Sequence, residues 1–213
     1  MSAIVLGVGP GLGMALARAY SLTGRRVAVV SRREQDAADF AAQLPGAAGF
    51  AADLGDPAAV TDVVRRAAGE LGAPDIVHYN ASVLLEGTPS QVGLDAVETS
   101  WRVGCLGAWA ALQAAVPLMD DGSAFFVTGG GLALEPWPPA SALASAKAAL
   151  RNMVQAAAKE LPDLRIAMIT IMGVIKEGTE LSPDEIARYF LSLLEESAPA
   201  IPPRTARLFD TEN

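Results

Sequence analysis

Residues 6–18 read Leu-Gly-Val-Gly-Pro-Gly-Leu-Gly-Met-Ala-Leu-Ala-Arg, directly after a short apolar run that opens the chain. The apolar run predicts a buried strand that ends at Gly7, and the residues beyond it predict a helix from Gly11 to Thr23. Glycines between a strand and a helix let backbone N–H groups approach an anion closely, and the first helical turn adds a partial positive charge. This junction therefore has the chemistry of a phosphate-binding turn.

Short apolar runs alternate with stretches of helical period along the chain, and no internal repeat interrupts them. Most of the runs are apolar throughout, which is typical of parallel strands covered by helices on both faces. The pattern predicts one α/β domain over residues 1–213, a doubly wound parallel sheet (Rossmann fold) of six to seven strands, with its ligand at the carboxyl ends of the strands. The expected strands are Ala3 to Gly7, Arg26 to Ser31, Ala47 to Ala52, Asp75 to Asn80, Ala124 to Thr128, Arg165 to Ile171 and, at one edge, Ala206 to Phe209.

Capping and stop signals place the ends of the helices. Asp56 before Pro57, and Ser182 before Pro183, each put a capping side chain next to a proline at the first helical position, which needs no donor. Gly72 stands where a helix is expected to stop. After Gly11 to Thr23, the expected helices are Arg33 to Gln43, Pro57 to Leu71, Leu94 to Met119 with room for a break in its middle, Ser141 to Leu161 and Pro183 to Glu196.

Composition narrows the classes of partner. The net charge is -8 and basic residues do not cluster, which excludes a nucleic-acid or anionic-membrane surface. One cysteine, Cys105, excludes an intrachain disulfide and favours a reducing compartment. The chain shows no charged leader and no apolar run long enough to cross a bilayer, so we expect a cytoplasmic protein. One histidine and one cysteine are too few for a metal site of soft or borderline ligands.

A dinucleotide site that prefers NAD places an acidic side chain roughly 20 residues beyond the glycines, where it binds the ribose 2′-hydroxyl. This chain has Ser31, Arg32 and Arg33 at that place. A hydroxyl and guanidinium groups suit a 2′-phosphate, because arginine donates paired hydrogen bonds to phosphate oxygens. The sequence therefore favours NADP(H) over NAD(H) as the nicotinamide dinucleotide.

On these residues the chain resembles the short-chain dehydrogenase/reductase family over nearly its whole length. Gly7, Gly11 and Gly13 match the family's Gly-x-x-x-Gly-x-Gly, and Lys147 in Ser-Ala-Lys-Ala-Ala-Leu matches its active-site lysine. Tyr-Asn-Ala-Ser at residues 79–82 is similar to the family's Asn-Asn-Ala-Gly, and Met-Gly-Val-Ile at 172–175 to the Pro-Gly-x-Val that lines the nicotinamide. With the residues above, the resemblance implies a cofactor site made of Gly7, Gly9, Gly11, Leu12, Gly13, Ser31, Arg32, Arg33, Asp53, Leu54, Asn80, Ala81, Ser82, Lys147, Gly173 and Ile175.

The family's proton-handling residues are mostly replaced in this chain. The family's tyrosine passes a proton to or from the substrate oxygen and lies four residues before the lysine, where this chain has Leu143. The family's serine falls on Gly130 and its helix asparagine on Gly104. Lys147 is kept, and without the tyrosine its expected role is to hydrogen-bond the ribose hydroxyls of the nicotinamide half of the cofactor. The resemblance is thus to an atypical member that lacks the catalytic Tyr and Ser.

Other groups could replace the missing acid. Hydride transfer to a carbonyl leaves a developing alkoxide, which needs a proton or a hydrogen-bond donor within reach. The nearby hydroxyls of Tyr79, Thr128 and Ser141 therefore join Lys147 as candidate catalytic residues, with a structural role as the alternative for each. His78, inside an apolar strand, is expected to be a packed core residue.

Three functions remain open. The first is an NADP(H)-dependent oxidoreductase whose unknown small-molecule substrate is a carbonyl, or an activated alkene or imine that needs little acid help. The second is a catalytically silent sensor of NADP(H) or partner protein, and the third a non-redox isomerase, dehydratase or lyase on the same scaffold. The helices expected over residues 94–119 and 141–161 carry Ala and Leu on more than one face, which predicts a homodimer or homotetramer.

Overall fold

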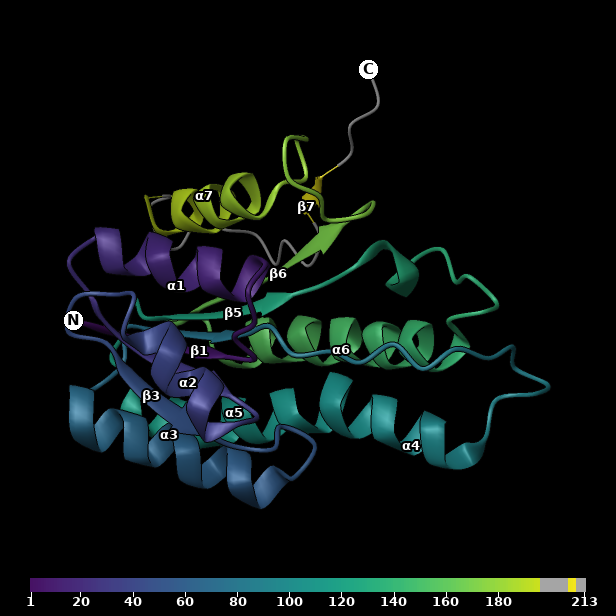
Figure 1. The fold of residues 1–213 in the computed structure, drawn as a ribbon, viewed down its shortest axis with the longest axis horizontal. Coiled ribbons are helices and arrows are strands. Elements are labelled where there is room, and N and C mark those ends of the chain that lie inside the picture. Colours follow the sequence, from purple (N-terminus) through teal and green to yellow (C-terminus); the bar gives the residue numbers. More distant parts are fainter. Residues whose placement is uncertain (196–206, 210–213) are drawn as a thin grey trace.

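The computed structural model describes residues 1–195 and 207–209. In this part of the chain seven parallel strands form one sheet in the order β3-β2-β1-β4-β5-β6-β7 (Figure 1). The order reverses between β1 and β4, which pair from Ala3 with Ile76 to Leu6 with Tyr79. Ligands of open α/β sheets bind at such a reversal, beyond the carboxyl ends of the strands. The strands are β1 (Ser2–Leu6), β2 (Arg26–Ser31), β3 (Ala48–Ala51), β4 (Ile76–Tyr79), β5 (Ala124–Thr128), β6 (Arg165–Ile171) and β7 (Arg207–Phe209).

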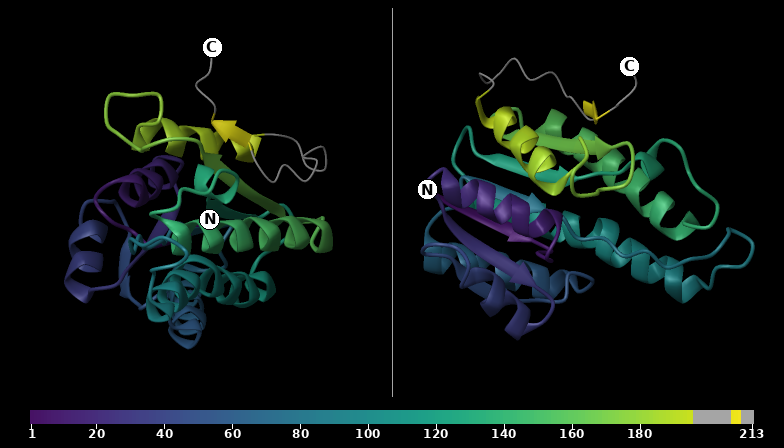
Figure 2. Two further views of the ribbon diagram at one scale, coloured as in Figure 1. Left: turned by 90° about the vertical axis from the view of Figure 1, so that its right-hand side faces the viewer. Right: turned by 45° about the horizontal axis from the view of Figure 1, so that its top comes forward.

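Helices cover both faces of the sheet, and the alternation of side chains along each strand decides which helices a residue meets. In β1, Ala3 and Val5 belong to the core with α1 and α7, whereas Ile4 and Leu6 belong to the core with α3, α5 and α6. Figures 1 and 2 show α1 beside α7 on one side of the sheet and α4 beside α6 on the other. The predicted doubly wound α/β fold is confirmed. The helices are α1 (Leu12–Leu22), α2 (Glu34–Ala41), α3 (Pro57–Leu71), α4 (Leu94–Trp101), α5 (Gly107–Ala115), α6 (Ser141–Glu160) and α7 (Pro183–Glu195).

The predicted boundaries hold best where the local chemistry is strongest. Strands β2, β5 and β6 and helix α3 match the predicted ranges residue for residue. The Asp56 side chain accepts a hydrogen bond of 2.9 Å from the Ala58 N–H at the start of α3, and Gly72 ends that helix with a φ of +92°. Strands β3 and β4 each lose their first and last predicted residues. Ala206, expected to open the edge strand, lies outside the described residues.

The long helix expected over residues 94–119 is broken by a π-helical turn, Arg102–Leu106, and closes with a 3₁₀ turn, Val116–Leu118. The Val103 carbonyl in the π turn accepts a hydrogen bond of 2.6 Å from the Tyr79 hydroxyl of β4. Gly107 follows the turn so closely packed that a Cβ there would lie 2.2 Å from both the Leu54 carbonyl oxygen and the Tyr79 hydroxyl oxygen. The break therefore brings the helix backbone against the end of β4.

This close approach predicts that Gly107→Ala destabilises the protein. In an open helix the same change stabilises by roughly 1 kcal/mol, but here the added methyl overlaps backbone, and we expect a loss of about 1–3 kcal/mol in the free energy of unfolding. Urea denaturation measures the change. Gly69→Ala in α3 is the matched control, because a Cβ at Gly69 meets nothing within 4 Å. Equal stability changes in the two variants would contradict the packing described for Gly107.

Candidate functional site

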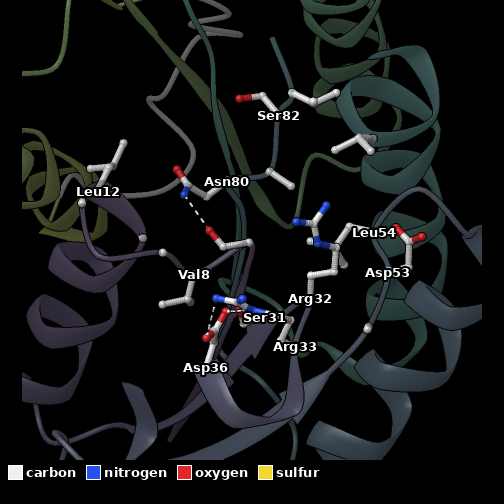
Figure 3. A pocket seen from close by; sticks show the side chains of 18 of the residues that line it. Val8, Leu12, Ser31, Arg32, Arg33, Asp36, Asp53, Leu54, Asn80 and Ser82 are labelled. Atoms are coloured by element: carbon white, nitrogen blue, oxygen red, sulfur yellow. Dashed lines mark hydrogen bonds and ion pairs between the residues drawn. The ribbon is translucent and has the colours of Figure 1, made fainter. Parts of the chain in front are cut away.

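A pocket of about 670 Å³ opens at the carboxyl ends of β1, β2, β3 and β4, where the strand order reverses (Figure 3). It joins the glycine-rich loop after β1, the start of the segment after β2, the residues that follow β3 and β4, and one face of α4. The residues that line it are Gly7, Val8, Gly9, Gly11, Leu12, Gly13, Ser31, Arg32, Arg33, Asp36, Ala52, Asp53, Leu54, Asn80, Ala81, Ser82, Val83, Thr99 and Val103.

The glycine-rich loop forms one wall of the pocket with bare backbone. Gly7 has a φ of +91°, and a Cβ there would lie 2.8 Å from the Ala81 backbone nitrogen. A Cβ at Gly13 would lie 2.8 Å from the Gly7 carbonyl oxygen, so the helix starts directly against the loop. The N-cap residue Gly11 has no capping side chain, and the first turn of α1 carries no acid. The amides at this helix N-terminus are left for an anionic ligand such as a pyrophosphate.

The two arginines after β2 differ in what they can bind. Arg33 Nε and Nη2 donate to the two carboxylate oxygens of Asp36 at 2.7 and 2.9 Å. Arg32 makes no salt bridge with any carboxylate in residues 1–195, and Figure 3 shows its guanidinium directed into the pocket beside Leu54. Ser31, nine-tenths buried, adds a hydroxyl at the same wall. A 2′-phosphate in this pocket would therefore meet Arg32 and Ser31, while Arg33 is already neutralised.

Asp53 and Leu54, both predicted to belong to the cofactor site, line the pocket beyond the end of β3. One oxygen of the Asp53 carboxylate accepts a hydrogen bond of 2.9 Å from the Gly55 N–H, which fixes the turn. Thr99 and Val103 face them from α4 and the π turn. This part of the pocket combines apolar walls with one oriented carboxylate, which suits a purine ring with an exocyclic amine.

Asn80, Ala81 and Ser82, predicted to bind the cofactor, line the pocket after β4. The Asn80 amide is held by the protein itself: its nitrogen donates to the Gly7 carbonyl at 2.9 Å, and its oxygen accepts from the Thr128 hydroxyl at 2.8 Å. Ala81 is the residue against which Gly7 packs. The hydrogen bond from Asn80 and the packing of Ala81 therefore hold the glycine-rich loop in position.

Lys147 lies on α6, is almost fully buried and does not line this pocket. Its ammonium donates a hydrogen bond of 2.9 Å to the Thr128 carbonyl at the end of β5. Burial lowers the pKa of Lys147 to about 8. Leu143 precedes it by one helical turn, so the two side chains lie on the same face of α6.

The other three candidate catalytic residues are not brought together. Tyr79 is fully buried, its hydroxyl donates to the Val103 carbonyl, and burial raises its pKa. The Ser141 hydroxyl donates to the Gly87 carbonyl at 2.6 Å and lines a separate pocket of about 340 Å³ beside Trp137. Thr128 donates to Asn80. Each hydroxyl is thus engaged inside the protein, and Tyr79 points into the core rather than into the larger pocket.

Gly173 and Ile175 follow β6 and do not line the larger pocket. A Cβ at Gly173 would lie 2.6 Å from Leu181, and Ile175 is 38 % exposed. Their predicted contact with the nicotinamide half stays a prediction.

Sequence reasoning missed six residues that line the pocket: Val8, Asp36, Ala52, Val83, Thr99 and Val103. Three of these, Asp36, Thr99 and Val103, carried a usable signal. Asp36 follows Arg33 by three positions at the start of a helix, a spacing at which opposite charges pair. Thr99 and Val103 are four residues apart and so share one helix face. The sequence did not show that this face meets the pocket, because the π turn that directs it has no clear signature.

His78 is buried, as predicted, and Cys105 is buried as well. Burial lowers the pKa of His78 to about 3, so the imidazole is neutral at physiological pH. Across residues 1–195 and 207–209, no three His, Cys, Asp or Glu side chains gather to hold a metal ion. The same residues include no helix long and apolar enough to cross a membrane.

This sheet, with a glycine-rich turn at its order reversal and a long pocket above it, defines the class of dinucleotide-binding α/β proteins. The short chain dehydrogenase family model matches residues 1–186. The chain belongs to the short-chain dehydrogenase family.

Similar proteins span most of the chain. A versicolorin reductase of Emericella nidulans is 29 % identical over 187 residues, which cover 84 % of this chain and 71 % of that relative. A short chain dehydrogenase of Burkholderia cenocepacia, solved in complex with NADP, is 24 % identical, with a TM-score of 0.89 over 98 % of this chain and 96 % of that chain. A blue fluorescent protein from a metagenomic library, solved in complex with NADPH, is 27 % identical, with a TM-score of 0.77 over 85 % of this chain and 76 % of that chain.

The buried lysine predicts a particular dependence of stability on pH. The folded-state pKa of Lys147 is about 8, whereas a lysine in an unfolded chain titrates near ~10.4. Between these values the unfolded chain binds more protons than the folded one, so this group makes stability rise with pH through that window. The free energy of unfolding of the unaltered protein minus that of Lys147→Met should therefore increase from about pH 8 to about pH 10. Urea denaturation at both pH values measures it, and a flat or falling difference would contradict the buried lysine.

Proposed function

We propose that this protein is an NADP(H)-dependent oxidoreductase with an atypical proton-handling site. The observation that carries the proposal is the pocket itself, in which open helix-terminal amides and the Arg32 guanidinium stand at two separate anion-binding positions. A dinucleotide with a pyrophosphate and a 2′-phosphate has anions at two such positions. The blue fluorescent protein that is 27 % identical to this chain was solved with NADPH, which supports the same cofactor here.

Different residues of the site would bind different parts of such a cofactor. The amides at Gly11, Leu12 and Gly13 would hold the pyrophosphate, Arg32 with Ser31 the 2′-phosphate, and Asp53 with Leu54 the adenine. Lys147 would hold the ribose hydroxyls of the nicotinamide half, which needs its ammonium to leave the Thr128 carbonyl or share it. The nicotinamide supplies the hydride chemistry when bound.

The proton-handling side decides which substrates fit. Leu143 cannot exchange a proton, and the hydroxyls of Tyr79, Thr128 and Ser141 donate to acceptors within the protein. A substrate whose oxygen must be protonated by a strong acid would therefore react slowly at this site. We propose an activated alkene or a protonated imine. Hydride addition to an iminium gives a neutral amine with no further proton, and the stabilised enolate left by an activated alkene can take its proton from water.

The same observation favours one second function, a catalytically silent protein that binds NADP(H). In this alternative the cofactor pocket serves to sense the dinucleotide or to stabilise a form that a partner recognises. Turnover distinguishes the two, because the silent protein binds NADPH without oxidising it on any substrate.

We also propose that two or more copies associate through α4 and α5. Trp101, Leu106 and Trp109 lie along this continuous run of helix and are 38 %, 43 % and 44 % exposed. Large apolar side chains grouped on a surface mark a contact between proteins. A homodimer or homotetramer would cover them.

The two arginines predict a selective effect on cofactor binding. Arg32→Ala removes charge-assisted hydrogen bonds to the 2′-phosphate, so NADPH binding should weaken roughly 10-fold to 100-fold. NADH, which lacks that phosphate, should bind Arg32→Ala as it binds the unaltered protein. Arg33→Ala is the matched control and should change NADPH binding little, since Arg33 is paired with Asp36. Fluorescence titration gives the dissociation constants, and equal losses in the two variants would contradict the assignment to Arg32.

A hydroxyl restored on α6 tests the proton-handling side. Leu143→Tyr places a phenol one turn before Lys147, and a positioned acid contributes roughly 100-fold to 10,000-fold to rate. We expect NADPH oxidation with a panel of ketones and aldehydes to rise strongly in this variant, while alkene or imine reduction by the unaltered protein changes little. Leu143→Phe adds the same ring without the hydroxyl and is the control. Equal carbonyl rates in the two variants would show that Leu143 does not occupy the position of the missing acid.

A further inference from the structure

Three buried polar side chains, Tyr20, His78 and Thr128, and the half-buried Asn80 form one hydrogen-bonded chain from the body of α1 to the glycine-rich loop. The Tyr20 hydroxyl lies 2.7 Å from His78 Nδ1, and His78 Nε2 lies 3.0 Å from the Thr128 hydroxyl. The Thr128 hydroxyl donates to the Asn80 amide oxygen at 2.8 Å, and the Asn80 amide nitrogen donates to the Gly7 carbonyl at 2.9 Å. Figure 3 shows the last of these bonds, from Asn80 to the loop.

The Gly7 carbonyl, at one end of this hydrogen-bonded chain, determines which group donates in each of its hydrogen bonds. The Gly7 carbonyl can only accept, so the Asn80 nitrogen faces it and the Asn80 oxygen faces Thr128. Because the Thr128 hydroxyl donates its hydrogen bond to the Asn80 amide oxygen, it accepts a hydrogen bond from His78 Nε2–H. A neutral imidazole has one N–H, so Nδ1 is an acceptor and receives the Tyr20 O–H. A donor therefore meets an acceptor at each of the four hydrogen bonds.

The surroundings of His78 hold this arrangement in place. His78 and Tyr20 are both fully buried, and the imidazole packs edge-on against Phe190 with ring centroids 4.3 Å apart. Phe126 lies at 6.2 Å on the neighbouring strand. An apolar residue at this position would need no polar partner. His78 needs a hydrogen-bond partner at each ring nitrogen, because an unpaired buried nitrogen is costly.

The chain ends at the part of the pocket that depends most on exact backbone position. Gly7 has a positive φ, and both Ala81 and Gly13 pack against it at distances that leave no space for a side chain. The Asn80 amide is the side chain that holds the Gly7 carbonyl from β4. If Asn80 turned, the carbonyl would lose its donor and the loop its fixed distance from the start of α1.

We propose that His78 is a positioning residue of the dinucleotide site: through Thr128 it fixes the Asn80 amide, and through Asn80 it holds the glycine-rich loop in the form that receives the pyrophosphate. This inference rests on the proposed function for the identity of the ligand. It assigns Thr128 to the support of the cofactor loop in place of proton transfer to substrate. It assigns Tyr20, in the third turn of α1, the task of setting the tautomer of His78.

The tautomer can be read directly, because this chain contains one histidine. With ¹⁵N-labelled histidine, NMR should show the neutral Nε2–H form, with no titration between about pH 5 and 8, where an ordinary histidine changes charge. Saturation with NADPH should shift the Nε2 resonance, since the chain ends in the cofactor loop. Observation of the Nδ1–H form, or of a histidine that titrates in this range, would overturn the proposal.

A matched pair of variants tests the link to binding. Thr128→Val keeps the size of the side chain and removes its hydroxyl, so NADPH should bind about tenfold more weakly, as for one lost hydrogen bond. Thr128→Ser restores the hydroxyl and should restore most of the affinity. Phe126→Leu, next to His78 but outside the chain, should lower the melting temperature without changing NADPH affinity.

The outcomes separate this inference from the proposed function. If the unaltered protein binds NADPH and Thr128→Val binds it equally well, the positioning role is wrong and the proposed function stands. An equal loss of affinity in Phe126→Leu and Thr128→Val would also overturn the positioning role, because it would trace the effect to general loosening of the core. If the unaltered protein binds no NADPH, both fall.

Discussion

The close approach of two backbones at the strand-order reversal is the constraint on which the rest of this structure depends. Gly7 leaves β1 with a positive φ and passes so near Ala81, beyond β4, that no side chain would fit between them. This contact sets where α1 begins, because Gly13 packs on the Gly7 carbonyl. It also sets the floor of the pocket, since the residues on both sides of the contact line it. The dinucleotide site is therefore a product of how two parallel strands end.

Much of this could be predicted from the sequence, for physical reasons that the residues make clear. Strands β2, β5 and β6 are continuous apolar runs flanked by turn residues, and burial on both faces leaves their ends well marked. Asp56, Pro57 and Gly72 bracket α3 with a cap, a fixed φ and a positive φ, so its length was predictable. The glycine spacing predicted one wall of the pocket because backbone access to a phosphate requires it.

The rest depended on directions that a one-dimensional pattern does not carry. A strand such as β4, buried on both faces, gives no apolar–polar alternation, so the sequence does not show which side of the sheet His78 faces and which side Tyr79 faces. Tyr79 was a reasonable candidate by position along the chain, yet its ring enters the core and meets the π turn. The ion pair with Asp36, three residues further on, distinguishes Arg33 from its neighbour Arg32, and only the structure shows which of the two arginines the carboxylate binds. Both differences arise from contacts between residues, which propensity does not encode.

The parallel sheet has a further consequence for how the chain is made. Strand β1 pairs with β2 on one side and with β4 on the other, so its second partner is synthesised only after β2, β3 and the helices between them. A nascent chain emerging from the ribosome therefore carries a half-paired apolar central strand for much of its synthesis. The turn after β1 reaches its native conformation only when residues 76–81 have been synthesised. Until then β1 has apolar side chains and one edge of unpaired backbone N–H and C=O groups, which chaperones or wrong partners can bind.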